Sequence, residues 1–338
     1  MSRKKHVPRL SLLVAVALML FVGRQLAFAG TINITASTAG GTKGFLYLTL
    51  RAAADYVEQK SGGKVKFTFY TNGSLLKYRQ TYRGVVDGVA DIANVIIGLY
   101  PGQFPKSGVL ELTPGYASGV KNGKDNAYLV RNYLLDEWKE VKVLYASSVP
   151  GNNLITAKKP VYRLSDVKGM RIRASGIGPK VAKAWGGVPV SMGTGEMYEA
   201  LQKGLVDGTI TNESGFISLK LADVCRYSNQ IYATQNAAIT IMNLKKYQSL
   251  PAEIRKIFDQ LMDWIPEVGG RISETQSEKG RKALLAAGGK IITYSPQEKS
   301  KFIDAMKSIN REWAEGLEAK GLPGLELLKA RNKLLGVE

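Results

Sequence analysis

Cysteine and histidine are almost missing from this chain of 338 residues, which contains one of each, Cys225 and His6. A single thiol cannot form a disulfide within its own chain, so the fold cannot rest on disulfide bridges. Two such residues also supply too few ligands for a Cys/His zinc site. The core must come from apolar packing, for which 45% hydrophobic residues is an ordinary supply.

Motifs of nucleotide binding and nucleophilic catalysis are missing as well. None of the Gly-Lys pairs is followed by Ser or Thr, and no Gly-x-Ser-x-Gly sequence occurs. Cys225 has no nearby base, so a buried structural thiol is a better prediction than a nucleophile. We therefore expect no cofactor, no metal and no catalytic residue.

The first thirty residues have the order of a secretion signal. Four basic residues within positions 3–9 precede an apolar run over 10–22, and Ala27-Phe28-Ala29 resembles a cleavage site. The run has 13 residues, whereas a membrane-spanning helix needs about 20. Residues 1–29 are thus predicted to be a cleaved signal peptide and the mature protein to be periplasmic. An uncleaved membrane anchor is the alternative.

Cleavage would change the composition of the mature chain. Removing 29 of the 338 residues leaves 309, without any histidine, and takes away five basic residues and no acidic one. The net charge falls from +19 to +14. A chain without histidine has no Ser-His-Asp triad, no Cys-His pair and no His-ligated metal.

The positive charge does not by itself indicate nucleic-acid binding. No run of five or more like charges occurs, and the basic residues are interspersed with acids. A basic, solvated surface is the simpler interpretation. Such a surface also attracts small anions toward a cleft.

Strand and helix patterns alternate along the chain in two similar blocks, which predicts α/β sheets with mainly parallel strands. The first block has strand patterns at 31–35, 65–69 and 91–97 and helix patterns at 45–60 and 78–87. The second has strand patterns at 142–148, 169–174, 188–191 and 208–211 and helix patterns at 179–185 and 196–203.

The last third predicts mainly helices. Pro251 is expected in a first helical turn, and Pro266 with Gly269-Gly270 should kink or break that helix before residues 271–287. A strand follows at 290–294. Ser295 is then a predicted N-cap, followed by a helix to about residue 320.

Two segments are candidates for contact with a ligand. The loop Gly40-Gly41-Thr42-Lys43-Gly44 precedes a helix, where either a plain turn or a ligand-facing loop is possible. In the strand near 170, Arg171 and Arg173 alternate with apolar residues. They could form an exposed basic stripe. Arg173, however, lies at the carboxyl end, which lines the ligand crevice in α/β sheets, and a guanidinium can hold a carboxylate with two hydrogen bonds.

The central runs Lys168-Gly-Met-Arg-Ile-Arg173, 184–190 and 196–208 resemble the signature of TRAP-transporter solute receptors of the dicarboxylate-binding (DctP) type. Weaker matches at 54–60, 86–92, 158–161 and 242–251 extend the resemblance over the mature chain. It implies an α/β two-lobed periplasmic-binding-protein fold (type II-like), with a long helix spanning both lobes. Lobe I would comprise 30–150 and about 238–270, and lobe II 151–237 and about 271–338.

The resemblance also implies a function. Such a receptor closes on a small organic acid and delivers it to a TRAP-type membrane permease, and Arg173 would be its carboxylate-clamping arginine. We expect a monomer that binds no nucleic acid.

The sequence departs from the family at three places. Asn153 stands where many relatives have a second arginine, Thr194 replaces an aromatic residue, and Thr211, followed by Asn212, stands where an asparagine is common. These differences favour a ligand with one dominant carboxylate and cast doubt on sialic acid and small C4-dicarboxylates. From the first lobe, Thr42 and Tyr100 are the expected contacts.

The sequence alone leaves other functions open. A sensory receptor that feeds a signalling partner, a receptor of another import system, or an exported lyase or isomerase could use a similar scaffold. The lyase would need an acid–base pair, which the sequence does not reveal.

Overall fold

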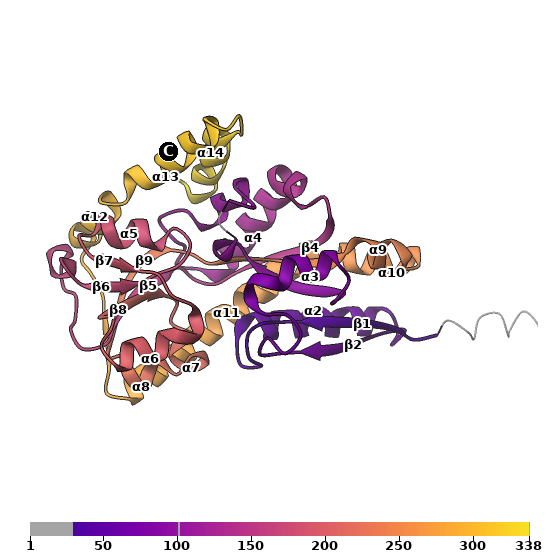
Figure 1. Cartoon of the computed structure of the whole chain (residues 1–338), viewed down its shortest axis with the longest axis horizontal. Coiled ribbons are helices and arrows are strands. Elements are labelled where there is room, and N and C mark those ends of the chain that lie inside the picture. The colour runs from indigo at the N-terminus through magenta and orange to yellow at the C-terminus, as the bar shows by residue number, and fades with distance from the viewer. Residues whose placement is uncertain (1–29, 101, 338) are drawn as a thin grey trace, which may run out of the picture.

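The structure, a computed structural model, describes residues 30–100 and 102–337; the predicted signal peptide lies outside this range. It contains two β-sheets (Figure 1). The first has the order β2-β1-β3-β10-β4, with β1 Ile32–Ser37, β2 Val65–Tyr70, β3 Ile92–Ile96, β4 Val141–Ser148 and β10 Ala237–Asn243. The second has the order β11-β9-β5-β8-β6-β7, with β5 Asn152–Thr156, β6 Arg171–Arg173, β7 Val188–Val190, β8 Gly208–Thr211, β9 Tyr227–Thr234 and β11 Lys290–Ile292.

Both sheets are mainly parallel, as predicted, but each contains one strand that runs against all the others. In the first sheet β10 runs antiparallel to β3 and β4, and in the second β5 runs antiparallel to β8 and β9. The physical reason is the way the chain changes sheet. From β4 to β5, and again from β9 to β10, it crosses in a few extended residues, with no crossover helix that would return it parallel.

The loop over residues 112–118, whose two flanking segments both pack on the first sheet, lies against these two crossings. Gly115 donates its backbone N–H to Tyr232 O at 2.8 Å, and Gly151 donates to Tyr116 O at 2.6 Å. A Cβ on Gly115 would lie 2.3 Å from Thr234 O, so only glycine permits this approach. The connection between the sheets is therefore a narrow set of closely packed backbone segments, the geometry of a hinge.

Helices cover both sheets. They are α2 Phe45–Lys60, α3 Thr81–Val86, α4 Gly119–Leu129, α5 Gly178–Ala184, α6 Met197–Gln202, α7 Gly215–Ser218, α8 Leu221–Val224, α9 Leu244–Ser249, α10 Ala252–Asp259, α11 Leu261–Ala286, α12 Pro296–Asp304, α13 Lys307–Glu318 and α14 Gly324–Leu335. The helix α2 has the predicted limits, because Leu46, Leu50, Ala53 and Val57 recur at helical spacing and are all buried.

The long helix α11 confirms the expected element that spans both lobes. It packs on α2, α4 and β4 of the first sheet and on α7, α8 and β11 of the second (Figure 1). The predicted break at Pro266 and Gly269-Gly270 is wrong, because α11 is continuous there and the chain breaks at Gln260 instead. Pro266 and Gly270 pack tightly on α4, where a Cβ on Gly270 would lie 2.5 Å from Val120 Cα, and Gly269 packs on Thr49 of α2.

Two other helix limits differ from the prediction. Pro251 is the N-cap of α10 and so precedes its first turn. The expected helix from Ser295 to about 320 is divided at Ala305–Met306 into α12 and α13; Ser295 does cap α12, accepting a hydrogen bond from Glu298 N.

The last two helices return to the first sheet. Leu317 and Leu327 belong to its apolar core, and the buried Arg331 of α14 donates hydrogen bonds to the carbonyls of Leu112, Thr113 and Pro114. The C-terminal part of the chain thus holds the segment that leads into the loop around Gly115.

Candidate functional site

Arg173 ends β6 with its guanidinium buried, at 3% exposure. Its Nε and one terminal nitrogen donate to Met192 O at 3.3 and 3.2 Å, and that terminal nitrogen also lies 3.4 Å from Thr194 Oγ1. Burial lowers the pKa of Arg173, but arginine remains cationic in proteins. Arg173 forms no ion pair with any of the described residues. A buried cation with only neutral partners calls for an anion.

A cavity of about 180 Å³ lies in front of Arg173, between the two sheets. The second sheet and its loops supply Arg173, Thr194, Thr211, Asn212 and Ser214, and the first supplies the 40–44 loop, Tyr78, Ile96 and Leu99. Among the described residues of the lining, Lys43 is the only other charged one, and none is Asp or Glu. The cavity is thus purely cationic, with both sheets facing its contents.

Three predicted residues meet Arg173 in this cavity. Thr194 touches the guanidinium, Thr211 ends β8, and Asn212 follows it. The side-chain oxygen of Asn212 accepts a hydrogen bond from Ser214 N at 3.0 Å, which orders the loop after β8. Hydroxyl and amide groups therefore surround the cation.

The other three predicted residues are placed differently. Asn153 is buried behind the cavity, where its side-chain oxygen accepts from Tyr232 N at 2.8 Å. Thr42 is exposed and does not line the cavity, although Gly41 and Lys43 do. The Tyr100 hydroxyl hydrogen-bonds Tyr78 O and Thr81 Oγ1, both at 2.9 Å, and its ring lines a neighbouring hollow.

Sequence reasoning missed several lining residues. Lys43 belongs to the 40–44 loop, but Thr42 is the residue of that loop that was predicted to contact the ligand. Asn236 lies in the crossing between β9 and β10, which the strand patterns did not reveal. Met197 and Leu219 come from helices α6 and the α7–α8 turn, where their apolar character indicates only core packing.

Glu111 lies beside the hinge in the neighbouring hollow, which has a volume of about 390 Å³. Its Oε1 accepts from Gly98 N at 3.1 Å and lies 3.5 Å from Ala237 N. Burial raises the pKa of this carboxyl to about 7. A Cβ on Gly98 or on Gly176 would lie 2.7 Å from its Oε2, so Glu111 fills the contact between the two sheets.

Cys225 is buried, and burial raises the pKa of its thiol to about 12, the opposite of an activated nucleophile. In the described part of the chain no cluster of three His, Cys, Asp or Glu residues could hold a metal ion. Across the same residues, no helix is both long and apolar enough to cross a membrane.

Comparison with known proteins identifies the family. Residues 37–316 match the profile of bacterial extracellular solute-binding protein, family 7, also called DctP. The chain belongs to this family. Its members are solute receptors, which agrees with a cationic cavity between two sheets. Among curated relatives, the uncharacterized protein YiiZ of Salmonella typhimurium is 25% identical over 245 residues, 68% of this chain and 72% of its own.

Solved structures of the family share the whole fold. A TRAP periplasmic solute-binding protein from Desulfovibrio salexigens, an open complex with the C-terminus of a symmetry mate in its ligand-binding site, is 30% identical, with a TM-score of 0.80 over 90% of this chain and 96% of its own. A TRAP solute-binding protein from Rhodoferax ferrireducens, in complex with copurified benzoate, is 25% identical, with a TM-score of 0.86 over 90% and 98%. These likenesses confirm the two-lobed α/β fold.

Proposed function

We propose that this protein is a periplasmic receptor that binds a small organic acid through Arg173 and delivers it to a TRAP-type permease. One observation carries the proposal: a buried guanidinium with only neutral partners faces a cavity whose lining contains no carboxylate. A ligand carboxylate would replace water at this cation and form two parallel hydrogen bonds with it.

The ligand class follows from the rest of the lining. Phe45, Leu46, Ile96, Leu99 and Met197 offer an apolar surface for the body of the ligand. Thr194, Thr211 and Asn212 offer hydrogen bonds near the cation. We infer a monocarboxylate with a compact apolar or aromatic body, and the benzoate bound by the Rhodoferax relative supports this class.

Closure of the two lobes would accompany binding. The ligand would contact residues of both sheets, and these contacts exist together only in the closed form, so the ligand favours that form. In this proposal lobe I comprises 30–150 and about 238–270 and lobe II 151–237 and about 271–338, with α14 packed on lobe I. The two crossings at Gly151 and 235–236, with the loop around Gly115 packed against them, would form the hinge.

The remaining parts of the proposal concern its cellular role. Residues 1–29 would be removed on export, and the mature receptor would act as a monomer. Asn153 would act indirectly, by fixing the backbone of Tyr232 behind the cavity. Binding would involve no bond chemistry, since the described lining of the cavity has no acid–base pair.

A thermal-shift comparison of benzoate with benzamide tests the ligand class. The two molecules have the same ring, but only benzoate carries a negative charge. The proposal predicts that benzoate and similar monocarboxylates raise the melting temperature, because they bind the folded state, and that benzamide does not. Equal shifts with both, or stabilisation by succinate alone among the acids, would contradict it.

A further inference from the structure

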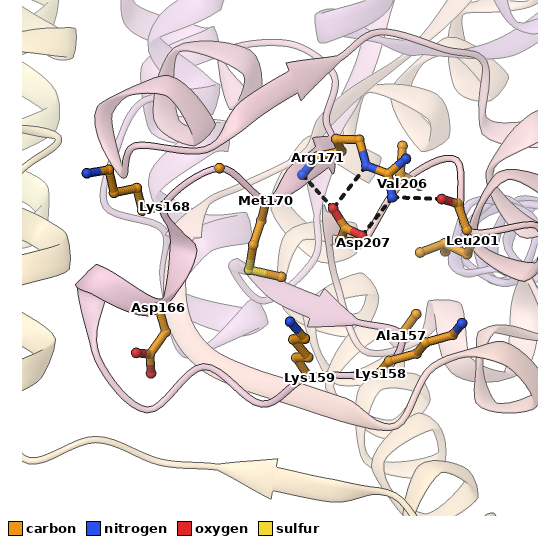
Figure 2. A pocket seen from close by; sticks show the side chains of 12 residues that line it. Ala157, Lys158, Lys159, Asp166, Lys168, Met170, Arg171, Leu201, Val206 and Asp207 are labelled. Carbon is orange, nitrogen blue, oxygen red and sulfur yellow. Dashed lines mark hydrogen bonds and ion pairs between the residues drawn. The ribbon is translucent and has the colours of Figure 1, made fainter.

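A second hollow lies in the lobe of the second sheet, away from the cleft (Figure 2). It has a volume of about 340 Å³ and lies at the amino end of β6, beside Arg171, whereas Arg173 at the other end of the same short strand faces the cleft. An occupant of this hollow would therefore leave the entrance to the cleft free.

Among the residues that line this hollow, the basic ones outnumber the acidic ones. Arg171 forms an ion pair with Asp207, in which Nε donates to Oδ2 at 3.1 Å and Nη2 donates to Oδ1 at 2.9 Å. Asp166 accepts from Tyr162 N at 2.9 Å and from Arg163 N and Nε at 3.1 and 3.2 Å.

Three further cations of the lining have no such partner. Lys158, Lys159 and Lys168 form no ion pair within the described residues. In Figure 2 the Lys159 side chain points into the hollow, and Lys158 and Lys168 lie at its two sides. Both acids of the lining thus pair with arginines, and three lysines without an ion pair among the described residues remain.

Apolar groups lie inside and around the hollow. Met170, Leu201 and Val206 contribute to its lining. Three residues next to lining residues have exposed apolar side chains, namely Tyr162 at 62% exposure, Val188 at 50% and Leu205 at 59%. The backbone N–H of Tyr162 donates to Asp166, Val188 pairs with Arg171 between β7 and β6, and Leu205 lies between the lining residues Gly204 and Val206 in the chain. Large exposed apolar side chains gathered around one hollow mark an interaction surface.

The exposure of the cations favours a macromolecule over a small anion. All three lysines are exposed, and a single ion pair at such a site contributes little binding free energy because water screens it. A protein segment that presents several carboxylates together, and covers the apolar rim, gains from each contact at once and excludes water from them.

We propose that the surface formed by Lys158, Lys159, Lys168, Tyr162, Val188 and Leu205 docks an acidic segment of a protein partner that also presents an apolar side chain. The position of this docking surface, at the opposite end of β6 from Arg173, allows the partner and the cleft ligand to bind together. The inference does not depend on which acid the cleft takes.

Fluorescence polarisation with labelled peptides tests this proposal on the mature protein. The probe is Asp-Glu-Leu-Glu-Asp, and the matched peptides are Asn-Gln-Leu-Gln-Asn, without charge, and Asp-Glu-Ser-Glu-Asp, without the apolar side chain. The test variant carries Lys158→Glu, Lys159→Glu and Lys168→Glu. The control carries Lys64→Glu, Lys245→Glu and Lys329→Glu, three exposed lysines elsewhere that also form no ion pair in the described residues.

We expect the acidic leucine peptide to bind the unmodified protein most tightly of the three. The docking-surface variant should weaken this binding about tenfold or more, whereas the control variant should change it little. Both variants should have the same melting temperature without ligand, which shows that each is folded, and the same thermal shift with benzoate, which separates this test from that of the proposed function.

Three results would overturn the proposal. They are the absence of peptide binding to the unmodified protein at about 0.15 M salt, equal weakening in both lysine variants, and full competition by inorganic phosphate at similar concentration. The last result would assign the hollow to a small anion.

Discussion

Arg281 of the long helix α11 forms an ion pair with the buried Glu213, with Nη1 and Oε2 2.7 Å apart. The same carboxylate accepts from Ser228 Oγ at 2.7 Å and from Gln230 Nε2 at 2.9 Å. Beside it, a Cβ on Gly280 would lie 1.9 Å from Glu213 O, so helix and loop are in direct contact. Asn212 and Ser214, the neighbours of Glu213, line the cleft. The helix that spans both lobes is therefore tied to a wall of the ligand cavity.

Arg281→Ala should destabilise the protein by about 3 kcal/mol, because it leaves the Glu213 carboxylate buried without its counter-charge. Arg271→Ala, on the same helix, is the matched control. Arg271 pairs with the exposed Glu267, and the loss of such a pair costs about 0–1 kcal/mol. Urea unfolding followed by circular dichroism measures both changes. Similar losses of unfolding free energy in the two variants would show that the Arg281–Glu213 pair contributes no more than an exposed ion pair.

Glu111 should make stability depend on pH. Its pKa is about 7 in the folded protein because it is buried, and near the ordinary 4.3 when unfolded. The folded state thus holds the proton more tightly. The stabilising contribution is full below about pH 4 and disappears as pH rises through 7. Its size is up to about 4 kcal/mol, from 1.36 kcal/mol per pKa unit.

Glu111→Gln keeps a neutral side chain of the same length and removes this titration. Between pH 5 and about 8 the unfolding free energy of the variant should fall less steeply than that of the unmodified protein. Parallel curves for the two proteins over this range would contradict the assignment of a raised pKa to Glu111.

Cys225 should resist thiol reagents in the folded state. Its thiol is buried, with a pKa of about 12, so the reactive thiolate is almost absent near neutral pH. Because it is the only cysteine of the chain, labelling with a disulfide reagent gives one clean signal. We expect labelling only after addition of denaturant, at the rate of unfolding. Rapid labelling of the native protein would refute this placement.

The elements predicted best are those whose pattern is local. The helix α2 could be delimited because an apolar stripe with helical spacing ends at Ser61-Gly62-Gly63, and β8 because a short β-branched run, Thr-Ile-Thr, follows Gly208. The end of β6 was also correct, which placed Arg173 at the carboxyl end of a strand. No long-range information was needed for these predictions.

The elements that were missed depend on the rest of the fold. All seven residues of β10, and all five of β5, are buried, so neither strand shows the alternation of a half-exposed strand. Their antiparallel pairing comes from the direct crossings between sheets.

The site residues divide in the same way, into those that a local pattern predicts and those that depend on the rest of the fold. Asn153 pairs with Thr211 across the strands, but a register irregularity between Asn152 and Leu154 turns its amide oxygen to Tyr232 N. Lys43 and Asn236 reach the cavity only because the two lobes face one another. The sequence pattern of one strand or loop cannot predict the register irregularity or the approach of the two lobes.

Isothermal titration calorimetry of Arg173→Ala and Arg171→Ala, with the monocarboxylate that gives the largest thermal shift, tests the central claim most directly. Both variants remove an arginine from β6, but Arg171 is paired with Asp207 outside the cleft. We predict that Arg173→Ala loses about 3–5 kcal/mol of binding free energy, as for a broken buried charge pair, and that Arg171→Ala binds almost normally. Near-normal affinity in Arg173→Ala would contradict the account.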